Sequence, residues 1–374
     1  MIEKIARRVA QFQVKKPYYF IAIFALITLL MIPGIFQIVN NVEPSLEKVL
    51  PQNIDEIQTM NYIRGEYGVD MIYVLVHTQD GAQDVRDPTY INYIHELTQK
   101  FETREYVVNV NSLSTQLLSH KDIESIPNTQ LEIEEAFKEI ESHKDYTNYA
   151  YSFSIIELQT TVGSSSSAIT QLINGINEDI ELSERSNPGT TSQVTGFSAI
   201  DYATFSVIMS DFLLITFVSM GVVGIIVWLT FQSLTRGMLP MIIVMNALVW
   251  TMGIVGYLGW TITVVSMVAA AMIMGLGIDF GIHQVHTYFK KREEEFKEAK
   301  IAIVEVVEEL YRAMLGASLT TISGFLALLF GVLPAMKTLG GILAIGIFTT
   351  LIGAMFLLPV VIYLYDRNNV YEKN

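Results

Sequence analysis

The sequence predicts an α-helical membrane protein with six transmembrane helices and one α+β domain inserted between the first and second of them. Three observations predict this class. The 374 residues are 51% hydrophobic with a mean hydropathy of +0.38, more apolar material than one globular core uses. Six apolar stretches are long enough to span a bilayer as helices. Residues 40–205 hold 26 acidic and 9 basic residues, whereas the rest of the chain holds 12 acidic and 15 basic residues.

The N-terminal region, residues 1–39, joins a basic flank to the first predicted span. Residues 1–16 carry five basic residues and one acidic residue, which predicts a cytoplasmic location under the positive-inside rule. The span is expected over residues 18–39. A cleaved signal peptide is the alternative interpretation, but the apolar stretch is longer than a typical signal core and no small-residue cleavage pattern follows it. We therefore expect an anchor.

Residues 40–205 have the size of one water-soluble domain. Asp87 caps a predicted helix that has Pro88 in its first turn. Apart from a middle helix, the predicted order is β-α-β, β-α-β, which favours a split βαβ, ferredoxin-like sandwich. The strands are expected at residues 71–78, 107–110, 149–160 and 192–195, and the helices at residues 88–103, 131–142 and 167–182.

The charge and the residue types of this domain exclude several functions. An acidic block argues against nucleic acid, which needs a basic face. The absence of cysteine excludes disulfides and thiolate metal sites. We expect no cofactor, no metal and no enzymatic activity, because the serines at 164–167 have no base nearby. One acidic run is interpreted as a solvated helix face and not as a metal site: Glu132, Glu134, Glu135, Glu139 and Glu141.

The last region, residues 206–374, is almost entirely membrane-spanning. Its spans are expected at residues 212–231, 238–258, 262–282, 313–333 and 341–363. Basic residues cluster in alternate connectors, which predicts a plasma-membrane protein with both termini cytoplasmic and residues 40–205 extracytoplasmic. Residues 292–309 alternate charged and apolar residues at helical spacing, and we expect them to form an amphipathic helix along the cytoplasmic surface.

The fourth span carries one carboxylate, Asp279, in an otherwise apolar stretch. A charge at membrane depth is costly and normally faces a protein interior or a water path, so Asp279 is a candidate functional residue. Gly275, Gly277 and Gly281 surround it and allow another helix to approach closely. The alternative interpretation is a packing helix with one tolerated acid.

Other polar residues of the spans have two interpretations each. His283 lies one helical turn from Asp279 and is either a proton relay or, with His286, a residue of the membrane interface. Asn246 is interpreted as a helix-helix contact, and Trp228, Trp250 and Trp260 as lipid-facing or interfacial residues.

Three stretches carry a family resemblance: Gly-Leu-Gly-Ile-Asp-Phe-Gly-Ile-His at 275–283, the group Tyr288, Arg292, Glu293 and Glu294, and Ser-Leu-Thr-Thr-Ile-Ser-Gly-Phe at 318–325. With one span, a large domain and five further spans, the chain resembles the repeat of the resistance-nodulation-division superfamily, in its hydrophobe and MmpL-like branch, which is related to sterol-sensing domains. The resemblance implies that residues 40–205 form a porter domain that handles lipids or other amphiphiles.

The resemblance also implies roles for individual residues. Asp279 is the expected proton-coupling acid, with His283 beside it. Thr320, Thr321 and Ser323 of the fifth span are expected to hydrogen-bond Asp279, or alternatively to bond back to carbonyls of their own helix. Helix packing near the site is expected from Gly275, Gly277, Phe280, Gly281 and Gly324.

The chain departs from the family pattern in three ways. No lysine lies within a predicted span, Phe280 stands where the branch usually has tyrosine, and the chain has one repeat where most members have two. A single repeat predicts either a homodimer about a two-fold axis or half of a longer protein.

Two functions of different class remain. The first is a proton-motive-force-driven transporter of lipids or other hydrophobic molecules, by efflux or uptake, in which protonation of Asp279 lets the helices repack. The alternative is an uncoupled lipid- or sterol-sensing-like binding module, or an export accessory like SecD and SecF. Those two lack the first glycines of the Gly-x-Gly-x-Asp pattern, which favours the transporter.

Overall fold

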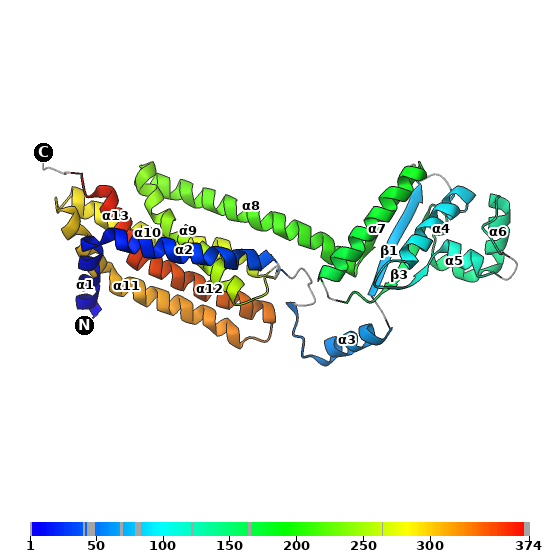
Figure 1. Ribbon diagram of the computed structural model, residues 1–374, viewed down its shortest axis with the longest axis horizontal. Coiled ribbons are helices and arrows are strands. Elements are labelled where there is room, and N and C mark those ends of the chain that lie inside the picture. The colour runs from blue at the N-terminus through cyan, green and yellow to red at the C-terminus, as the bar shows by residue number, and fades with distance from the viewer. Residues whose placement is uncertain are drawn as a thin grey trace. The chain divides into compact units, whose positions relative to one another are not determined.

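The computed structural model describes residues 2–39, 42, 49–67, 70–78, 84–120, 123–163, 166–263 and 265–369. The chain forms two compact units, each described here by itself (Figure 1). The membrane unit consists of Met1–Glu43 and Ile208–Asn374, and the second unit of Pro44–Val207.

The described part of the membrane unit contains six helices that are long and apolar enough to cross a bilayer, which confirms the predicted number of spans. The long helix α8 begins fifteen residues before its expected span, so that the boundary between the two units falls within it. The spans are formed by α2 (Pro17–Val39), α8 (Phe197–Phe231), α9 (Leu234–Tyr257), α10 (Ala269–Glu293), α11 (Ala299–Ala327), and α12 (Pro334–Ile352) with α13 (Leu358–Asp366).

The helices α2 and α9 pack closely through a shared polar contact. The Thr28 hydroxyl accepts from Asn246 Nδ2 at 3.0 Å and from Trp250 Nε1 at 2.9 Å. Asn246 therefore makes the predicted helix-helix contact. Trp250 is buried and stacks on Phe24 with 5.0 Å between ring centroids, so its interpretation as a lipid-facing or interfacial residue is wrong. The indole N–H needs a buried acceptor, and Thr28 on the neighbouring helix supplies one.

The last span is interrupted by a π-helical segment, Gly353–Leu357, between α12 and α13. The N–H of Leu358 bonds to the carbonyl of Gly353, five residues back. The next residue, Pro359, has no N–H to offer to the turn before it. Carbonyls of this turn must therefore find other donors, because none is available from the hydrocarbon core of a bilayer.

Two buried glutamine side chains supply those donors. Gln284 of α10 donates from Nε2 to the carbonyl of Ala354 at 2.8 Å, and Gln13 donates from Nε2 to the carbonyl of Met355, also at 2.8 Å. Gln13 belongs to α1 (Ile2–Lys15), an amphipathic helix where the sequence predicted only a basic flank. The irregular turn is thus bonded to two helices far from it in the sequence.

At one end of the bundle, α10 and α13 are joined by a buried ion pair. Arg292 Nε lies 2.6 Å from Asp366 Oδ2, and both side chains are almost inaccessible. Tyr288 donates its hydroxyl to the same carboxylate at 3.0 Å. The remaining guanidinium nitrogens of Arg292 donate to the carbonyls of Lys297 and Asn369, both at 2.6 Å. Both charges are thereby compensated.

The segment between α10 and α11 differs from the expected surface helix over residues 292–309. Arg292 and Glu293 end α10, and residues 299–309 form the first turns of α11, which continues without a break into the fifth span. The alternating pattern is explained by contacts on this side of the bundle: Ala302, Ile303 and Val306 are buried, while charged residues between them are paired or exposed.

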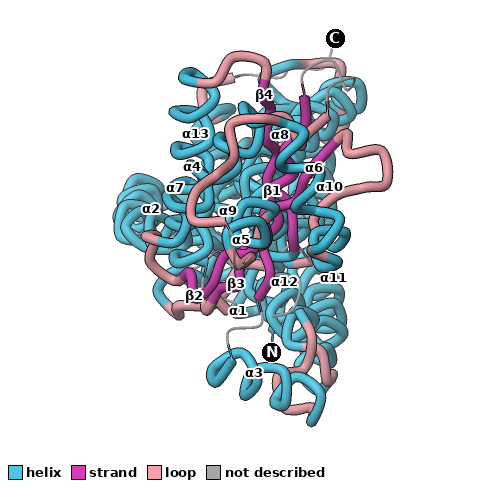
Figure 2. Tube along the Cα trace, turned by 90° about the vertical axis from the view of Figure 1, so that its right-hand side faces the viewer, coloured by secondary structure: helices cyan, strands magenta, loops and turns pink. Residues whose placement is uncertain are grey.

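The second unit contains an antiparallel sheet, magenta in Figure 2, with the strand order β2-β3-β1-β4. With α4 (Pro88–Glu102) between the first two strands and α7 (Ser166–Ser186) between the last two, this is the predicted split βαβ topology. Asp87 caps α4, accepting from Thr89 N at 2.8 Å as expected. The strands are β1 (Asp70–Thr78), β2 (Val107–Asn111), β3 (Phe153–Thr160) and β4 (Thr190–Gly196).

The core of this unit lies between the sheet and its helices. Ile72, Val74 and Val76 of β1 alternate with less buried residues and are fully covered, as a strand with one buried face requires. The described part of this unit contains three further α-helices, of which the first two were not predicted: α3 (Asp55–Tyr67), α5 (Leu113–Leu118) and α6 (Gln130–Glu139).

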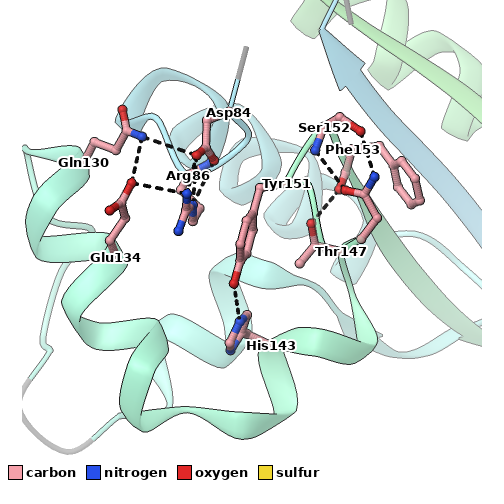
Figure 3. A network of polar contacts seen from close by, with 10 residues as sticks. Asp84, Arg86, Gln130, Glu134, His143, Thr147, Tyr151, Ser152 and Phe153 are labelled. Atoms are coloured by element: carbon pink, nitrogen blue, oxygen red, sulfur yellow. Dashed lines mark hydrogen bonds and ion pairs between the residues drawn. The ribbon is translucent and has the colours of Figure 1, made fainter. Parts of the chain in front are cut away.

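A polar network holds α6 to the loops beside it (Figure 3). Arg86 lies 3.3 Å from Glu134 and donates from Nε to Asp84 at 2.9 Å, and its guanidinium lies 3.8 Å over the ring of Tyr151. The Tyr151 hydroxyl meets His143 Nε2 at 3.0 Å. Glu134 is therefore an exception within the acidic run, whose other members are exposed as expected.

Candidate functional site

Asp279 lies in the middle of α10, a helix with two different faces. One face, with Ile273, Gly277 and Gln284, is buried against α9, α12 and the π segment. The other face is exposed within the single chain and carries Asp279 together with Met272, Leu276, His283 and His286 at helical spacing. The Asp279 side chain is therefore accessible from outside the single chain.

A cavity of about 480 Å³ opens beside Asp279 between α10, α11 and α12. Its polar groups are Asp279, His283 and Thr321, and the rest of its wall is apolar. The lining residues are Leu276, Asp279, Phe280, His283, Leu310, Ala313, Met314, Ala317, Thr321 and Ile347. The structure thus brings Asp279 and His283 of α10 and Thr321 of α11 to one cavity.

The hydroxyl groups of α11 bond to their own helix. Thr320 donates to the carbonyl of Ala317 at 2.9 Å and lies 3.1 Å from that of Gly316, and Thr321 donates to Ala317 at 2.9 Å. Ser323 is exposed. Among the described residues no hydrogen bond to Asp279 is present, so both threonines adopt the self-bonded alternative in this structure.

The glycines around the site divide into two groups. A Cβ on Gly277 would lie 2.8 Å from Thr350 Cγ2, and one on Gly281 would lie 2.7 Å from Pro240 Cβ, so both permit close helix packing within the chain. Gly275 and Gly324 face open space. Phe280 is half-buried in the cavity wall and supplies no hydroxyl.

One residue that shapes the site, Gln284, was missed by the sequence reasoning. Gln284 lies five residues after Asp279 on the opposite face of the same helix and fixes α10 to the π segment. A glutamine within an apolar helix, and Pro359 within the last span, are the signals that could have indicated this bond. The partner of Gln284 lies 70 residues away and is a backbone carbonyl, so its identity required the structure.

Six apolar helices, with a single carboxylate facing a mostly apolar cavity, define a multi-pass membrane protein of transporter-like build. The model of the MMPL family matches residues 65–373, and the chain belongs to that family, within the resistance-nodulation-division superfamily. This confirms the resemblance drawn from the sequence.

Two relatives extend the comparison. Membrane protein MJ1562 of Methanocaldococcus jannaschii is 28% identical over 380 residues, which cover 98% of this chain and 96% of the relative. Membrane protein ActII-3 of Streptomyces coelicolor is 28% identical over 179 residues, which cover 46% of this chain and 24% of the relative. The first comparison therefore covers nearly the whole of both chains.

Proposed function

We propose that the chain is a transporter of lipids or other hydrophobic or amphiphilic molecules, driven by the proton-motive force and working as a homodimer. The observation that carries this proposal is the position of Asp279. Its carboxylate lies in a helix that is long and apolar enough to cross a membrane, on an exposed face of that helix and at the wall of a mostly apolar cavity.

The chemistry follows from the cost of a charge in hydrocarbon. An ionised carboxylate at the centre of a membrane helix costs about 3 kcal/mol on insertion scales, whereas its neutral form costs far less. Uptake of a proton by Asp279 therefore lowers the free-energy cost of placing this face of α10 against apolar side chains or lipid. His283, one turn away in the same cavity, is the group proposed to pass the proton. Thr320 and Thr321 are proposed to exchange their present carbonyl partners for the carboxylate in another state, and Ser323 is proposed to bond to the carboxylate in that state.

The homodimer is proposed because the site is open in one chain. Met272 and Leu276 of α10 are exposed on the same helix face as Asp279, and nothing lies within 4 Å of a Cβ added at Gly275 of this face. An isologous pair is the commonest way to close such a face. A second copy would shield the carboxylate from lipid and complete the cavity wall.

The second unit is proposed to act as an extracytoplasmic porter domain, with both termini in the cytoplasm of a plasma-membrane protein. The excess of acid in residues 40–205 and the basic residues near the connectors of the membrane unit support this orientation. Motion of α10 would reach the last span through the bond from Gln284 to Ala354.

The test is transport in liposomes that contain the purified chain and a fluorescent lipid, under an imposed proton gradient. Wild type is expected to move the lipid only with the gradient, and Asp279→Asn, which keeps the shape of the side chain, is expected to lose that dependence. Asp211→Asn, an exposed acid at the start of the span in α8, is the matched control and should behave as wild type. Gradient-independent lipid movement in all three would contradict the proposal and favour an uncoupled lipid-binding module.

A further inference from the structure

The helix α1 is a fixed part of the membrane unit. Figure 1 shows it running crosswise to the long helices α2 and α11 at the end of the bundle where the chain begins. Ala6, Ala10 and Gln13 form its inner face and are buried against the bundle, and Gln13 is bonded to the last span. The opposite face of α1 is therefore held in one orientation.

That outward face consists of two parallel strips. Lys4, Arg8 and Lys15 are exposed and form a basic strip. Beside it, Ile5 and Phe12 are 49% and 45% exposed and lie seven residues apart, on one line along the helix. Apolar and basic strips side by side are the pattern of helices that lie in the interface of a membrane.

The apolar strip points toward the place where the first span begins. The ring of Phe12 meets the ring of Phe20 edge-on, with 5.8 Å between centroids. Phe20 belongs to the first turn of α2, which starts at Pro17. Phe12 therefore lies beside the first turn of the span formed by α2, and in a membrane the neighbouring long basic side chains would reach lipid headgroups there.

The basic strip carries positive charge that no described acidic side chain neutralises. Arg7, outside the strip, lies 3.7 Å from Glu308. Within the described residues, Lys4, Arg8 and Lys15 have no acidic partner. We infer that the outward face of α1, formed by Lys4, Ile5, Arg8, Phe12 and Lys15, binds the headgroups of anionic membrane lipids. This site is separate from the Asp279 cavity and does not depend on transport.

The experiment measures lipid binding to the purified full chain in neutral detergent by native mass spectrometry. Dioleoylphosphatidylglycerol is titrated against dioleoylphosphatidylcholine, and wild type is expected to prefer the anionic lipid. K4Q/R8Q/K15Q removes the three positive charges of the strip and should lower the affinity for phosphatidylglycerol to about that for phosphatidylcholine. The control K138Q/K144Q/R185Q removes the same charges from exposed positions of the second unit and should bind as wild type.

Two further measurements distinguish lipid binding from a folding defect and from binding of any phosphate group. The charge-preserving variant K4R/R8K/K15R should bind phosphatidylglycerol as wild type does, which separates the loss of charge from a folding defect. Excess inorganic phosphate should not displace the lipid, because the apolar strip gives it no contact. The inference is overturned if K4Q/R8Q/K15Q binds phosphatidylglycerol like wild type, if the control loses as much affinity, or if phosphate competes as well as the lipid does.

Discussion

Gln284 donates a hydrogen bond to the carbonyl of Ala354 at 2.8 Å, and so the helix that carries Asp279 is tied to the irregular turn of the last span. The bond is buried, and Pro359 removes a backbone donor from the same turn. Any movement of α10 along its axis must therefore break this bond or displace α13. The π segment is the irregular part of the backbone of the last span, and it is the part to which this movement of α10 would be transmitted.

Replacement of Gln284 by alanine is expected to lower the free energy of unfolding. The change leaves the Ala354 carbonyl without its side-chain donor in a buried place, which costs about 1 to 3 kcal/mol. Chemical unfolding in detergent micelles measures the loss, with Gln11→Ala, an exposed glutamine of α1, as the control. Equal stability of Gln284→Ala and wild type would show that the turn finds another donor.

The buried pair of Arg292 and Asp366 gives a second stability prediction. Arg292→Gln leaves the carboxylate of Asp366 buried and uncompensated, and a loss of about 3 to 5 kcal/mol is expected. The double variant Arg292→Met with Asp366→Leu should recover much of this, since it removes both charges. The exposed pair of Arg185 and Glu181 is the comparison, and Arg185→Gln should cost no more than about 1 kcal/mol. Similar losses at both positions would contradict the account.

Substitution of Gly281 is expected to lower the stability of the fold, whereas substitution of Gly275 is expected to prevent dimer formation. In Gly281→Ala the new Cβ meets rigid atoms of Pro240 at 2.7 and 2.9 Å, so the single chain should lose stability. In Gly275→Leu the side chain enters open space, so the fold should persist while the proposed dimer face is blocked. Native mass spectrometry measures the oligomeric state of Gly275→Leu and wild type. A wild type that is monomeric in every detergent and lipid, or a Gly275→Leu variant that is fully dimeric, would count against the dimer.

Cysteine labelling tests the orientation of the two units. The chain has no cysteine of its own, so single replacements at Lys138 and Glu294, both exposed, are unambiguous reporters. An impermeant thiol reagent applied to intact cells should label the cysteine at 138 and leave the cysteine at 294 unlabelled until the membrane is opened. The reverse pattern would place residues 40–205 in the cytoplasm.

Patterns of local spacing predicted much of this fold. The six spans and the split βαβ order follow from apolar runs and period-two alternation, and the Asp87 cap follows from an aspartate directly before Pro88 at a helix start, all of which depend on neighbouring residues. Contacts between distant segments could not be predicted in this way. The stacking of Trp250 on Phe24 and the bond from Gln13 to Met355 join residues more than 200 positions apart. The type of a residue does not tell which neighbouring helix its side chain contacts. For the same reason the sequence indicated Asp279 but not that it faces outward.

Titration of Asp279 itself is the most direct test of the proposed mechanism. Infrared difference spectra of the chain in lipid, recorded between acidic and neutral pH, report the gain of a protonated carboxyl group. The account predicts a carboxyl band that wild type and Asp211→Asn share and that Asp279→Asn lacks. An identical band in Asp279→Asn and wild type would show that Asp279 does not exchange its proton in this range, and the proton-driven mechanism would then be contradicted.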